Sequence, residues 1–500
     1  MQAFRFVGVA SVLIVAFVTV GYVVREPGPA AEDSTHVELQ AADDFASQVS
    51  VLGLRFGRKG HPKHPAQSNR PIVFSTTGTT AAPVTTAAPV NTTAPVTTVT
   101  TVAPVTTVTT VAPVTTVAPV NTTAPVTAFP GCVGVAVTPN SNLATVAQAH
   151  PAGTTFCLGA GTYVVTTAIP AQTGDRFVGS ANRGSILTGN NSTTIAFAAS
   201  SGPNVVLQNL VIEKFASPLQ HGAVGGQRPR ASTDTGWRID NCEFRLNNGA
   251  AIYATGGWRV TNSYIHHQGQ IGVKARGANG PILFENNEIS FNNVNNVSSG
   301  WEAGGSKFLE TDGLTLRGNY VHDNNGQGLW TDSDNIRTLV EHNRVFNNVN
   351  EGIFHEISYD AVIRFNEVRG NGVNDHPWLY GAGILIAHSP NVEVYGNVVA
   401  GNGNGIGVIQ QNRGSGRHGP WEIRNVWVHD NDVTMTAGSY TGLAKDTGDN
   451  TIFTGKNNRF TNNEYHVASA TGAAWEWMNG RKSWSEWQGF GMDTGGALVP

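Results

Sequence analysis

Charged residues are scarce in this 500-residue chain, so the places where they gather suggest where chemistry could occur. Only 13% of the residues are Asp, Glu, Lys or Arg, against about 25% in an average globular protein. Lys274, Arg276 and Lys307 precede Asp332 and Glu356 along one stretch of the chain. Basic side chains can hold an anionic group and neutralise a developing negative charge, and carboxylates beside them can orient a ligand or bind a cation, so together they could form a functional site. They form such a site only if the fold brings them together.

The composition excludes several classes of protein. The formal net charge is -4, and no concentrated basic patch indicates a nucleic-acid partner. Lys, Glu and Arg, which are strong helix formers, are scarce, and Gly occurs 58 times, which predicts β structure and turns. Three cysteines are too few for a small fold held together by disulfides. We therefore expect an all-β globular part that does not bind nucleic acid.

Three segments precede the globular part. Residues 6–24 contain no charge and no proline, and a run of this length suits a membrane-spanning helix. We interpret residues 1–25 as a signal anchor or a cleaved signal peptide, with a buried helix as a third alternative. Residues 26–78 are polar, and residues 79–128 contain almost only Thr, Val, Ala and Pro, which predicts a disordered stalk. The globular part, 129–500, is therefore expected outside the cell, anchored to the membrane by this helix or secreted.

One unit recurs from residue 205 onward, with a short apolar strand, a polar residue, an apolar anchor, an Asn/Gly turn and a second strand. The anchors are 21 to 34 residues apart and are Ile212, Phe244, Ile265, Ile289, Val321, Val345, Val368, Val399, Val433 and Phe460. The residue two before the anchor is Asn in seven consecutive units, Asn287, Asn319, Asn343, Asn366, Asn397, Asn431 and Asn458. This register predicts a parallel β-solenoid whose coils stack about 4.8 Å apart.

The polar position of this repeat is expected to be structural. Stacked Asn amides can donate and accept hydrogen bonds along the stack, and Asn tolerates the left-handed turn conformation. Cys242 occupies the same position in an earlier unit. We therefore expect Cys242 to be a buried free thiol and not a nucleophile.

Both ends of the solenoid have expected caps. Residues 141–150 predict a short amphipathic helix that is bracketed by Cys132 and Cys157. In an exported protein we expect these two cysteines to form a disulfide, with a free pair as the alternative. Ser483 and Glu486 match a Ser-x-x-Glu capping box, which predicts a helix whose tryptophans cover the last coil.

Four segments with glycine before an apolar strand resemble a known superfamily. They are residues 159–163, 326–332, 352–358 and 383–389, and they are similar to right-handed parallel β-helix proteins of the pectate-lyase-like (pectin lyase fold) superfamily. The resemblance covers roughly residues 130 to 500 and implies a right-handed parallel β-helix. This superfamily includes polysaccharide lyases, glycoside hydrolases, mannuronan epimerases, adhesins and phage tailspikes, so the resemblance does not choose a function.

Alternate residues of a strand point to opposite faces, so aligning the second strands of the units predicts two outward files. The first file contains Tyr253, Lys274, Lys307, Trp330, Phe354, Leu385 and Gly407. The second contains Thr255, Arg276, Asp332, Glu356 and Ala387. This alignment brings the scattered charges into one cluster beside aromatic rings, an arrangement that suits a charged sugar polymer.

Within that resemblance, the cluster predicts a lyase or C5-epimerase that acts on an acidic polysaccharide of uronate residues. Removal of the C5 proton, which is α to a carboxylate, needs a base and a positive charge that neutralises the developing anion. Lys307 is the candidate base because nearby cations would lower its pKa; His388 is the alternative base, and Arg276 is the expected clamp for the substrate carboxylate. The expected substrate-binding residues are Lys274, Trp330, Phe354 and Glu356.

Other interpretations stay open from the sequence. Asp332 and Asp334 could supply oxygen ligands to Ca²⁺, although an ordinary polar turn is the favoured explanation. We expect no other cofactor, and we expect a monomer. The outward files could also belong to a non-catalytic polysaccharide-binding or adhesive module, or to a structural spacer with a solvated surface. Residues 310–313 read Glu-Thr-Asp-Gly, which is similar to the Asn-Thr-Asp-Gly of polygalacturonase-like hydrolases. The adjacent pair of aspartates that this family also uses is missing from residues 129–500, which disfavours that class.

Overall fold

The computed structural model describes residues 127–499, except 130, 199, 227–233, 278, 375–376, 468 and 470. The expected membrane segment, the polar segment and nearly all of the expected stalk lie outside the described residues. Among the residues that are described, no helix is long and apolar enough to cross a membrane.

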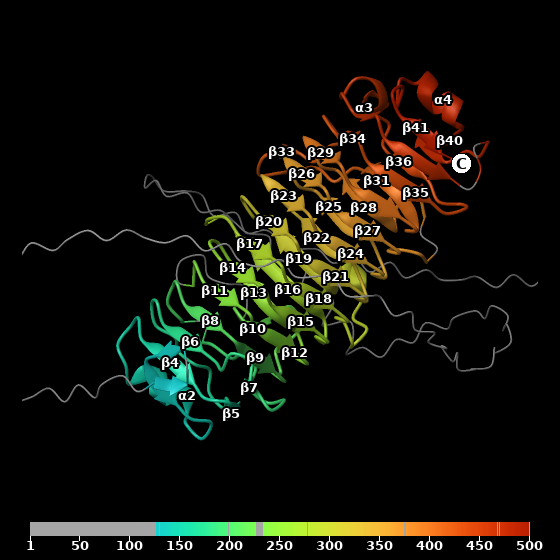
Figure 1. The fold of residues 1–500 in the computed structure, drawn as a ribbon. Coiled ribbons are helices and arrows are strands. Elements are labelled where there is room, and N and C mark those ends of the chain that lie inside the picture. Colours follow the sequence, from blue (N-terminus) through green and yellow to red (C-terminus); the bar gives the residue numbers. More distant parts are fainter. Residues whose placement is uncertain are drawn as a thin grey trace, which may run out of the picture. The chain divides into compact units, whose positions relative to one another are not determined.

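Three long sheets form the β-helix, and between residues 222 and 467 each coil contributes one strand to each sheet, whereas the first coils have no strand in sheet 1 (Figure 1). Sheet 1 carries the predicted outward files. Its strands are, in spatial order, β10 (Gly222–Val224), β13 (Ala250–Ala254), β16 (Ile271–Arg276), β19 (Gly304–Leu309), β22 (Leu329–Asp332), β25 (Ile353–Glu356), β28 (Ala382–Ala387), β31 (Asn404–Gln410), β36 (Thr441–Lys445), β39 (Trp475–Trp477) and β40 (Gly480–Lys482).

Sheet 2 precedes sheet 3 in every coil. Sheet 2 contains β3 (Val135–Val137), β4 (Thr155–Leu158), β6 (Arg176–Val178), β8 (Val206–Gln208), β11 (Arg238–Asp240), β14 (Arg259–Thr261), β17 (Leu283–Glu285), β20 (Thr315–Arg317), β23 (Thr338–Glu341), β26 (Ala361–Arg364), β29 (Val392–Tyr395), β34 (Trp427–His429) and β37 (Arg459–Thr461). Sheet 3 contains β5 (Gly161–Val164), β7 (Ser185–Thr188), β9 (Leu210–Glu213), β12 (Glu243–Arg245), β15 (Tyr264–His266), β18 (Glu288–Ser290), β21 (Tyr320–His322), β24 (Arg344–Phe346), β27 (Glu367–Arg369), β30 (Val398–Ala400), β35 (Asp432–Met435), β38 (Glu464–Val467) and β41 (Ala497–Val499).

The predicted anchors stack in sheet 3 in the expected parallel register. Val321 pairs with Val345, and Val345 pairs with Val368. The register is as predicted as far as Val433, whose partner is Tyr465. The last predicted anchor, Phe460, is wrong because it lies in β37 of sheet 2.

Two ladders of asparagine hold the coils together at the corners of sheet 3. In the predicted ladder, the amide nitrogen of Asn343 donates to the side-chain oxygen of Asn366 at 2.9 Å, and Asn366 repeats this contact with the next coil. The ladder continues through Asn463 and not through the predicted Asn458. A second ladder, which we did not predict, lies five residues further along each coil and comprises Asn247, Gln268, Asn292, Asn324, Asn348, Asn371 and Asn402.

Replacing Asn366 with alanine is expected to destabilise the β-helix by about 3 kcal/mol, because several buried groups lose their partner at once. These groups are the Asn343 amide, the Val340 carbonyl and the Asn397 side-chain oxygen. Urea unfolding measures the change. The control is Asn374→Ala, since Asn374 is exposed and makes no hydrogen bond within the described part of the chain. A similar loss in both variants would contradict a structural role of the ladder.

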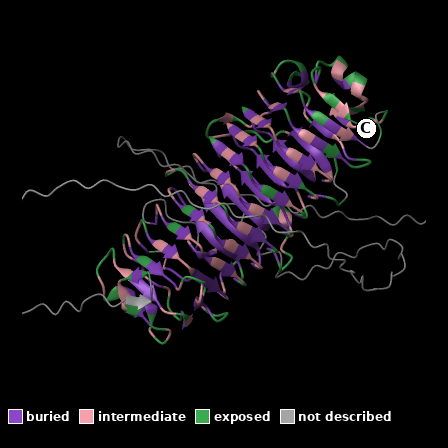
Figure 2. Ribbon diagram, in the orientation of Figure 1, coloured by how far each residue is buried: buried purple, intermediate pink, exposed green. Residues whose placement is uncertain are grey.

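The interior of the coils is apolar, and the exposed residues gather in the turns and at the ends (Figure 2). Helix α2 (Leu143–Gln148), shorter than the helix expected, covers the first coils, with Asn142 as its N-cap. The structure joins Cys132 and Cys157 in a disulfide with Cα atoms 5.9 Å apart.

Two further helices follow near the C-terminal end, α3 (Thr451–Thr454) and α4 (Trp484–Gly489). Helix α4 starts with the predicted capping box of Ser483 and Glu486. Its own Trp487 is buried. Two short antiparallel pairs complete the fold, namely β1 (Thr127–Phe129) with β2 (Cys132–Val133) and β32 (Ser415–Gly416) with β33 (Gly419–Pro420).

Cys242 is buried and free, and burial raises its pKa to about 12, which keeps the thiol protonated.

Candidate functional site

The outward files of sheet 1 lie as the alignment predicts. Lys274 pairs with Lys307 across β16 and β19, and Trp330 pairs with Phe354 across β22 and β25. In the second file Leu309, which the prediction did not include, separates Arg276 from Asp332. The strands therefore place the basic residues on earlier coils and the acidic residues on later ones.

A cavity of about 390 Å³ opens on this face of sheet 1. We call it the first cavity. Its floor comes from β19, β22 and β25 and consists of Lys307, Trp330, Asp332, Phe354 and Glu356. Its walls come from turns and loops and include Gly300, Gln327, Asn350, Glu351, Pro377, Tyr380 and Arg413. Five of the predicted site residues thus line one cavity.

Lys307 is held in place by opposite charge and by an aromatic ring. Its Nζ lies 2.7 Å from Oδ2 of Asp332 and 3.5 Å from Oε1 of Glu302. The same Nζ lies 3.5 Å from the ring centre of Trp330. These contacts fix the amino group of Lys307 in one position between its partners. The arrangement therefore disfavours the predicted role of Lys307 as a base and favours a role as a fixed positive charge.

Lys274 and Arg276 lie on the same face of the sheet, but they do not line the first cavity. The Lys274 ammonium contacts Gln220 and lies 2.5 Å from Glu302. Burial lowers the pKa of Lys274, and the charge of Glu302 opposes that shift. The Arg276 guanidinium is ion paired with Glu310. Both cations are ion paired with carboxylates. Neither is therefore the unpaired positive charge that was expected to act on Lys307.

Glu356 is the most perturbed carboxyl group on the floor of the first cavity. Burial raises its pKa, and the neighbouring charge of Asp332 raises it further, while Arg413 partly offsets both effects. Arg413 Nη1 lies 2.7 Å from Oε1, and the Trp330 indole nitrogen donates to Oε2 at 3.2 Å. Trp330 in turn stacks on Phe354, with ring centres 5.6 Å apart and planes at 10°. Glu356 therefore keeps its proton to a higher pH than an ordinary glutamate.

His388, the alternative base, follows β28 and is completely buried. It does not line the first cavity. Burial lowers its pKa to about 3, and the charge of Arg413 adds to that effect. A neutral, inaccessible imidazole of such low basicity is unfavourable for proton abstraction from a substrate.

The two candidate calcium ligands have other partners. Asp332 is ion paired with Lys307. Oδ1 of Asp334 accepts hydrogen bonds from the backbone of Arg417 at 3.1 Å and from the Trp421 indole at 3.2 Å. Within the described ranges, no group of three or more His, Cys, Asp or Glu residues could hold a metal ion. The structure therefore assigns Asp334 to positioning a loop and gives no support to the calcium hypothesis.

That loop, residues 411–421, brings the most important residue that we did not predict, Arg413. The loop follows β31 and folds back over earlier coils. Arg417 lies 2.7 Å from Glu310, and the Tyr359 hydroxyl donates to the backbone of Gly419 at 2.7 Å. The only signal in the sequence is a pair of arginines in a long insertion between two repeat units.

Comparisons with known proteins agree with this architecture. Residues 230–399 match a protein family described as "Right handed beta helix region". No curated protein matches the chain. Similar solved structures include the A-module of mannuronan C-5 epimerase AlgE6 from Azotobacter vinelandii, at 14% identity over 71% of this chain and 93% of that one, with a TM-score of 0.45. A complex of XylC with xylose matches at 12% identity over 71% of this chain and 82% of that one, with a TM-score of 0.48.

A third similar structure is the Dettilon tailspike protein, at 13% identity over 68% of this chain and 70% of that one, with a TM-score of 0.38. Structural likeness at such low values does not choose a function. The family match and the three stacked parallel sheets together identify the fold. The described part of this chain is a right-handed parallel β-helix.

Proposed function

We propose that this β-helix is a carbohydrate-active enzyme that cleaves glycosidic bonds of an acidic polysaccharide by acid–base chemistry. The observation that carries the proposal is the pair Asp332 and Glu356 on the floor of the first cavity. Glu356 has a raised pKa, whereas Asp332 is ion paired with Lys307. Two neighbouring carboxyl groups, one of which keeps its proton to a higher pH, can act as the acid and the base of such a site.

The roles follow from these environments. Protonated Glu356 gives its proton to the glycosidic oxygen while the bond from that oxygen to the anomeric carbon breaks. The Asp332 carboxylate attacks the anomeric carbon from the opposite side. A water molecule then gives a proton to Glu356 and its hydroxyl to the sugar, which restores both carboxyl groups. Neighbouring strands are about 4.8 Å apart, and this spacing favours the retaining form of the reaction, which needs carboxyl groups about 5 Å apart.

The remaining lining suits a sugar that carries a negative charge. Lys307 and Arg413 line the cavity on either side of the carboxyl pair. Phe354 and Tyr380 supply apolar ring surface to the same cavity, and sugar rings pack on such surfaces through their C–H groups. When Glu356 is protonated it no longer neutralises Arg413, whose guanidinium group can then bind the carboxylate of an acidic sugar, so we propose an acidic polysaccharide as the substrate.

A second reaction is β-elimination or C5 epimerisation at a uronate residue, and one observation favours it. Two cations line the same cavity as an acid, so the charge that develops next to the uronate carboxylate could be neutralised there. In this reaction Asp332 would be the base instead of Lys307, because the Lys307 ammonium is fixed by its partners.

One set of assays separates these reactions. The full chain is incubated with a panel of uronate-containing polysaccharides, with Glu356→Gln as the inactive control. New reducing ends without absorbance near 235 nm indicate hydrolysis, and new ends with that absorbance indicate elimination. A change at C5 seen by NMR without cleavage indicates epimerisation. Binding without any change in the polymer would contradict the enzyme proposal and favour a binding module.

A further inference from the structure

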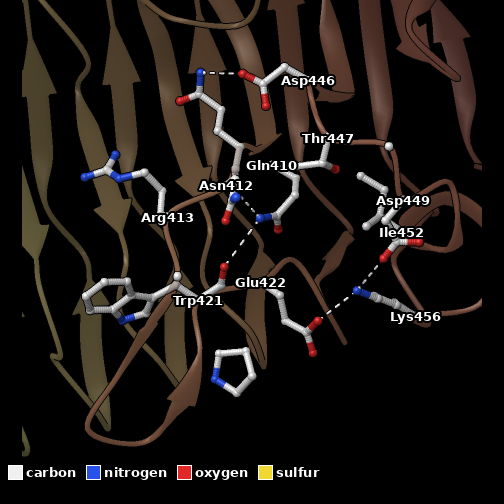
Figure 3. A pocket seen from close by; sticks show the side chains of 14 residues that line it. Gln410, Asn412, Arg413, Trp421, Glu422, Asp446, Thr447, Asp449, Ile452 and Lys456 are labelled. Carbon is white, nitrogen blue, oxygen red and sulfur yellow. Dashed lines mark hydrogen bonds and ion pairs between the residues drawn. The ribbon is translucent and has the colours of Figure 1, made fainter.

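A second and larger cavity of about 800 Å³ shares Arg413 with the first. Figure 3 shows the residues that line it. We call it the second cavity. Loop 411–421 and the segment after β36 enclose it, and Ile452 of α3 contributes an apolar surface. A volume of this size is within the range of small-molecule sites, which is about 300–1,000 Å³. No predicted site residue and none of the proposed chemistry involves this cavity.

The two cavities meet at Arg413, which lines both of them. Its guanidinium group is ion paired with Glu356, the proposed acid of the first cavity. Figure 3 shows the Arg413 side chain pointing away from the other labelled residues of the second cavity. A polymer chain bound in the first cavity would therefore reach the second cavity by passing this one residue.

Polar groups without partners line the second cavity. The hydroxyl of Thr447 is buried and has no hydrogen-bond partner. The side-chain amide of Asn412 makes no hydrogen bond within the described part of the chain, and it is exposed. Buried polar groups in proteins are almost always paired. A ligand with hydroxyl groups would supply the missing partner once the Thr447 side chain turns its hydroxyl into the cavity.

The other polar walls are already fixed by contacts within the protein. Lys456 Nζ lies 2.8 Å from Glu422 and 2.8 Å from Asp449. Gln411 donates to Asp446 at 3.2 Å. The walls of the second cavity are thus braced before a ligand arrives, which reduces the entropy cost of binding.

The charges of the second cavity disfavour an anionic ligand. Of the three carboxylates that line it, those of Glu422 and Asp449 are ion paired with Lys456, and Asp446 has no cationic partner among the described residues. Arg413 adds little there, because its guanidinium group points away from the other labelled residues and contacts Glu356 in the first cavity (Figure 3). The lining therefore selects an uncharged, hydroxylated ligand, which is the opposite of the preference of the first cavity.

We propose that the second cavity binds an uncharged sugar of the same polysaccharide whose acidic sugar occupies the first cavity. This inference rests on the function proposed for the first cavity. It identifies the substrate as a heteropolysaccharide in which acidic and neutral sugars occur in one chain, and it excludes polymers made only of uronate residues.

Steady-state kinetics of the full chain test the inference. The probes are gellan, which contains both glucuronate and neutral sugars, and two pure polyuronates, polygalacturonate and alginate. We expect turnover of gellan and little turnover of either polyuronate. In Asn412→Ala/Thr447→Val, KM for gellan should rise about tenfold, as expected for two lost hydrogen bonds, with kcat within twofold. The control Asn374→Ala changes an exposed asparagine outside both cavities and should leave KM unchanged.

A charge reversal tests the selection against anions. Asp446→Lys should raise the turnover of polygalacturonate relative to gellan by about tenfold, because an acidic sugar then meets a cation in the second cavity. An unchanged KM in the double variant, or equal turnover of gellan and polyuronates by the wild type, would overturn the inference while leaving the function of the first cavity intact.

A binding measurement separates this failure from failure of the catalytic proposal. Titration calorimetry with gellan oligosaccharides reports on binding whether or not the chain is catalytic. Binding that Asn412→Ala/Thr447→Val weakens, in a chain that turns over no polymer, refutes the catalytic proposal and supports sugar binding in the second cavity. The absence of binding by the wild type overturns both proposals.

Discussion

Replacing Glu356 with glutamine is expected to lower kcat by a factor of about 10² to 10⁴, the usual contribution of a general acid. Glutamine keeps the shape of the side chain and an oxygen that can accept the hydrogen bond from Arg413. It has no acidic proton to give to a leaving oxygen. Turnover of the polysaccharide identified by the product assays measures the effect. Glu393→Gln, at a half-exposed site in sheet 2, is the control and should retain full activity.

The pH dependence of the same group has a definite sign. The folded protein holds the pKa of Glu356 above its usual value, so activity should fall as the pH rises through that raised pKa. Below the pKa that Glu356 has in the unfolded chain, this carboxyl group makes its full contribution to the stability of the folded state. That contribution is lost as the pH rises through the pKa that Glu356 has in the folded state. Glu356→Gln should therefore be at least as stable as the wild type at alkaline pH. Wild-type activity in this variant would contradict the role of Glu356.

Replacing Lys307 with methionine is expected to destabilise the protein by about 3 kcal/mol or more. Removing one partner of a buried ion pair leaves the other charge uncompensated, and here the Asp332 carboxylate would lose its ammonium partner. Urea unfolding measures this loss. Lys445→Met is a matched control, because Lys445 is equally buried but its ammonium contacts the Thr447 carbonyl and no carboxylate. The control should lose much less stability.

A double variant distinguishes the ion pair from other effects of Lys307. Lys307→Met/Asp332→Asn removes both charges, so much of the lost stability should return. Activity should not return, because the carboxylate of Asp332 is then missing. A single variant Lys307→Met that is as stable as the wild type would show that the pair adds nothing to the fold.

The solenoid could be predicted because each coil repeats the same physical requirement. An apolar anchor must fill the interior, and an asparagine must satisfy backbone groups at the corner, so the two recur together at one spacing. The prediction failed in the last coil for a specific reason. Asn458-Arg459-Phe460 and Asn463-Glu464-Tyr465 both fit the pattern, and only the pairing of strands decides that Tyr465 follows Val433.

The residues on the floor of the first cavity could also be predicted from the sequence, whereas the residues of its walls could not. Trp330, Asp332 and Glu356 lie on strands, where alternation fixes the direction of each side chain. Arg413 and Glu302 lie in insertions of irregular length, whose path depends on contacts with distant coils. The expected role of Lys307 as a base depended on unpaired neighbours. Glu302 and the other carboxylates that neutralise those neighbours have no place in the repeat.

Loop 411–421 changes how the β-helix holds together. In a solenoid each coil normally contacts only its neighbours, so the stack can open from an end one coil at a time. This loop follows β31, yet it contacts Glu310, Asp334 and Tyr359, which follow or extend beyond β19, β22 and β25. It thus ties non-adjacent coils to each other. We therefore expect the coils from β19 to β31, which include the floor of the first cavity, to melt as one cooperative block even where the ends of the stack fray.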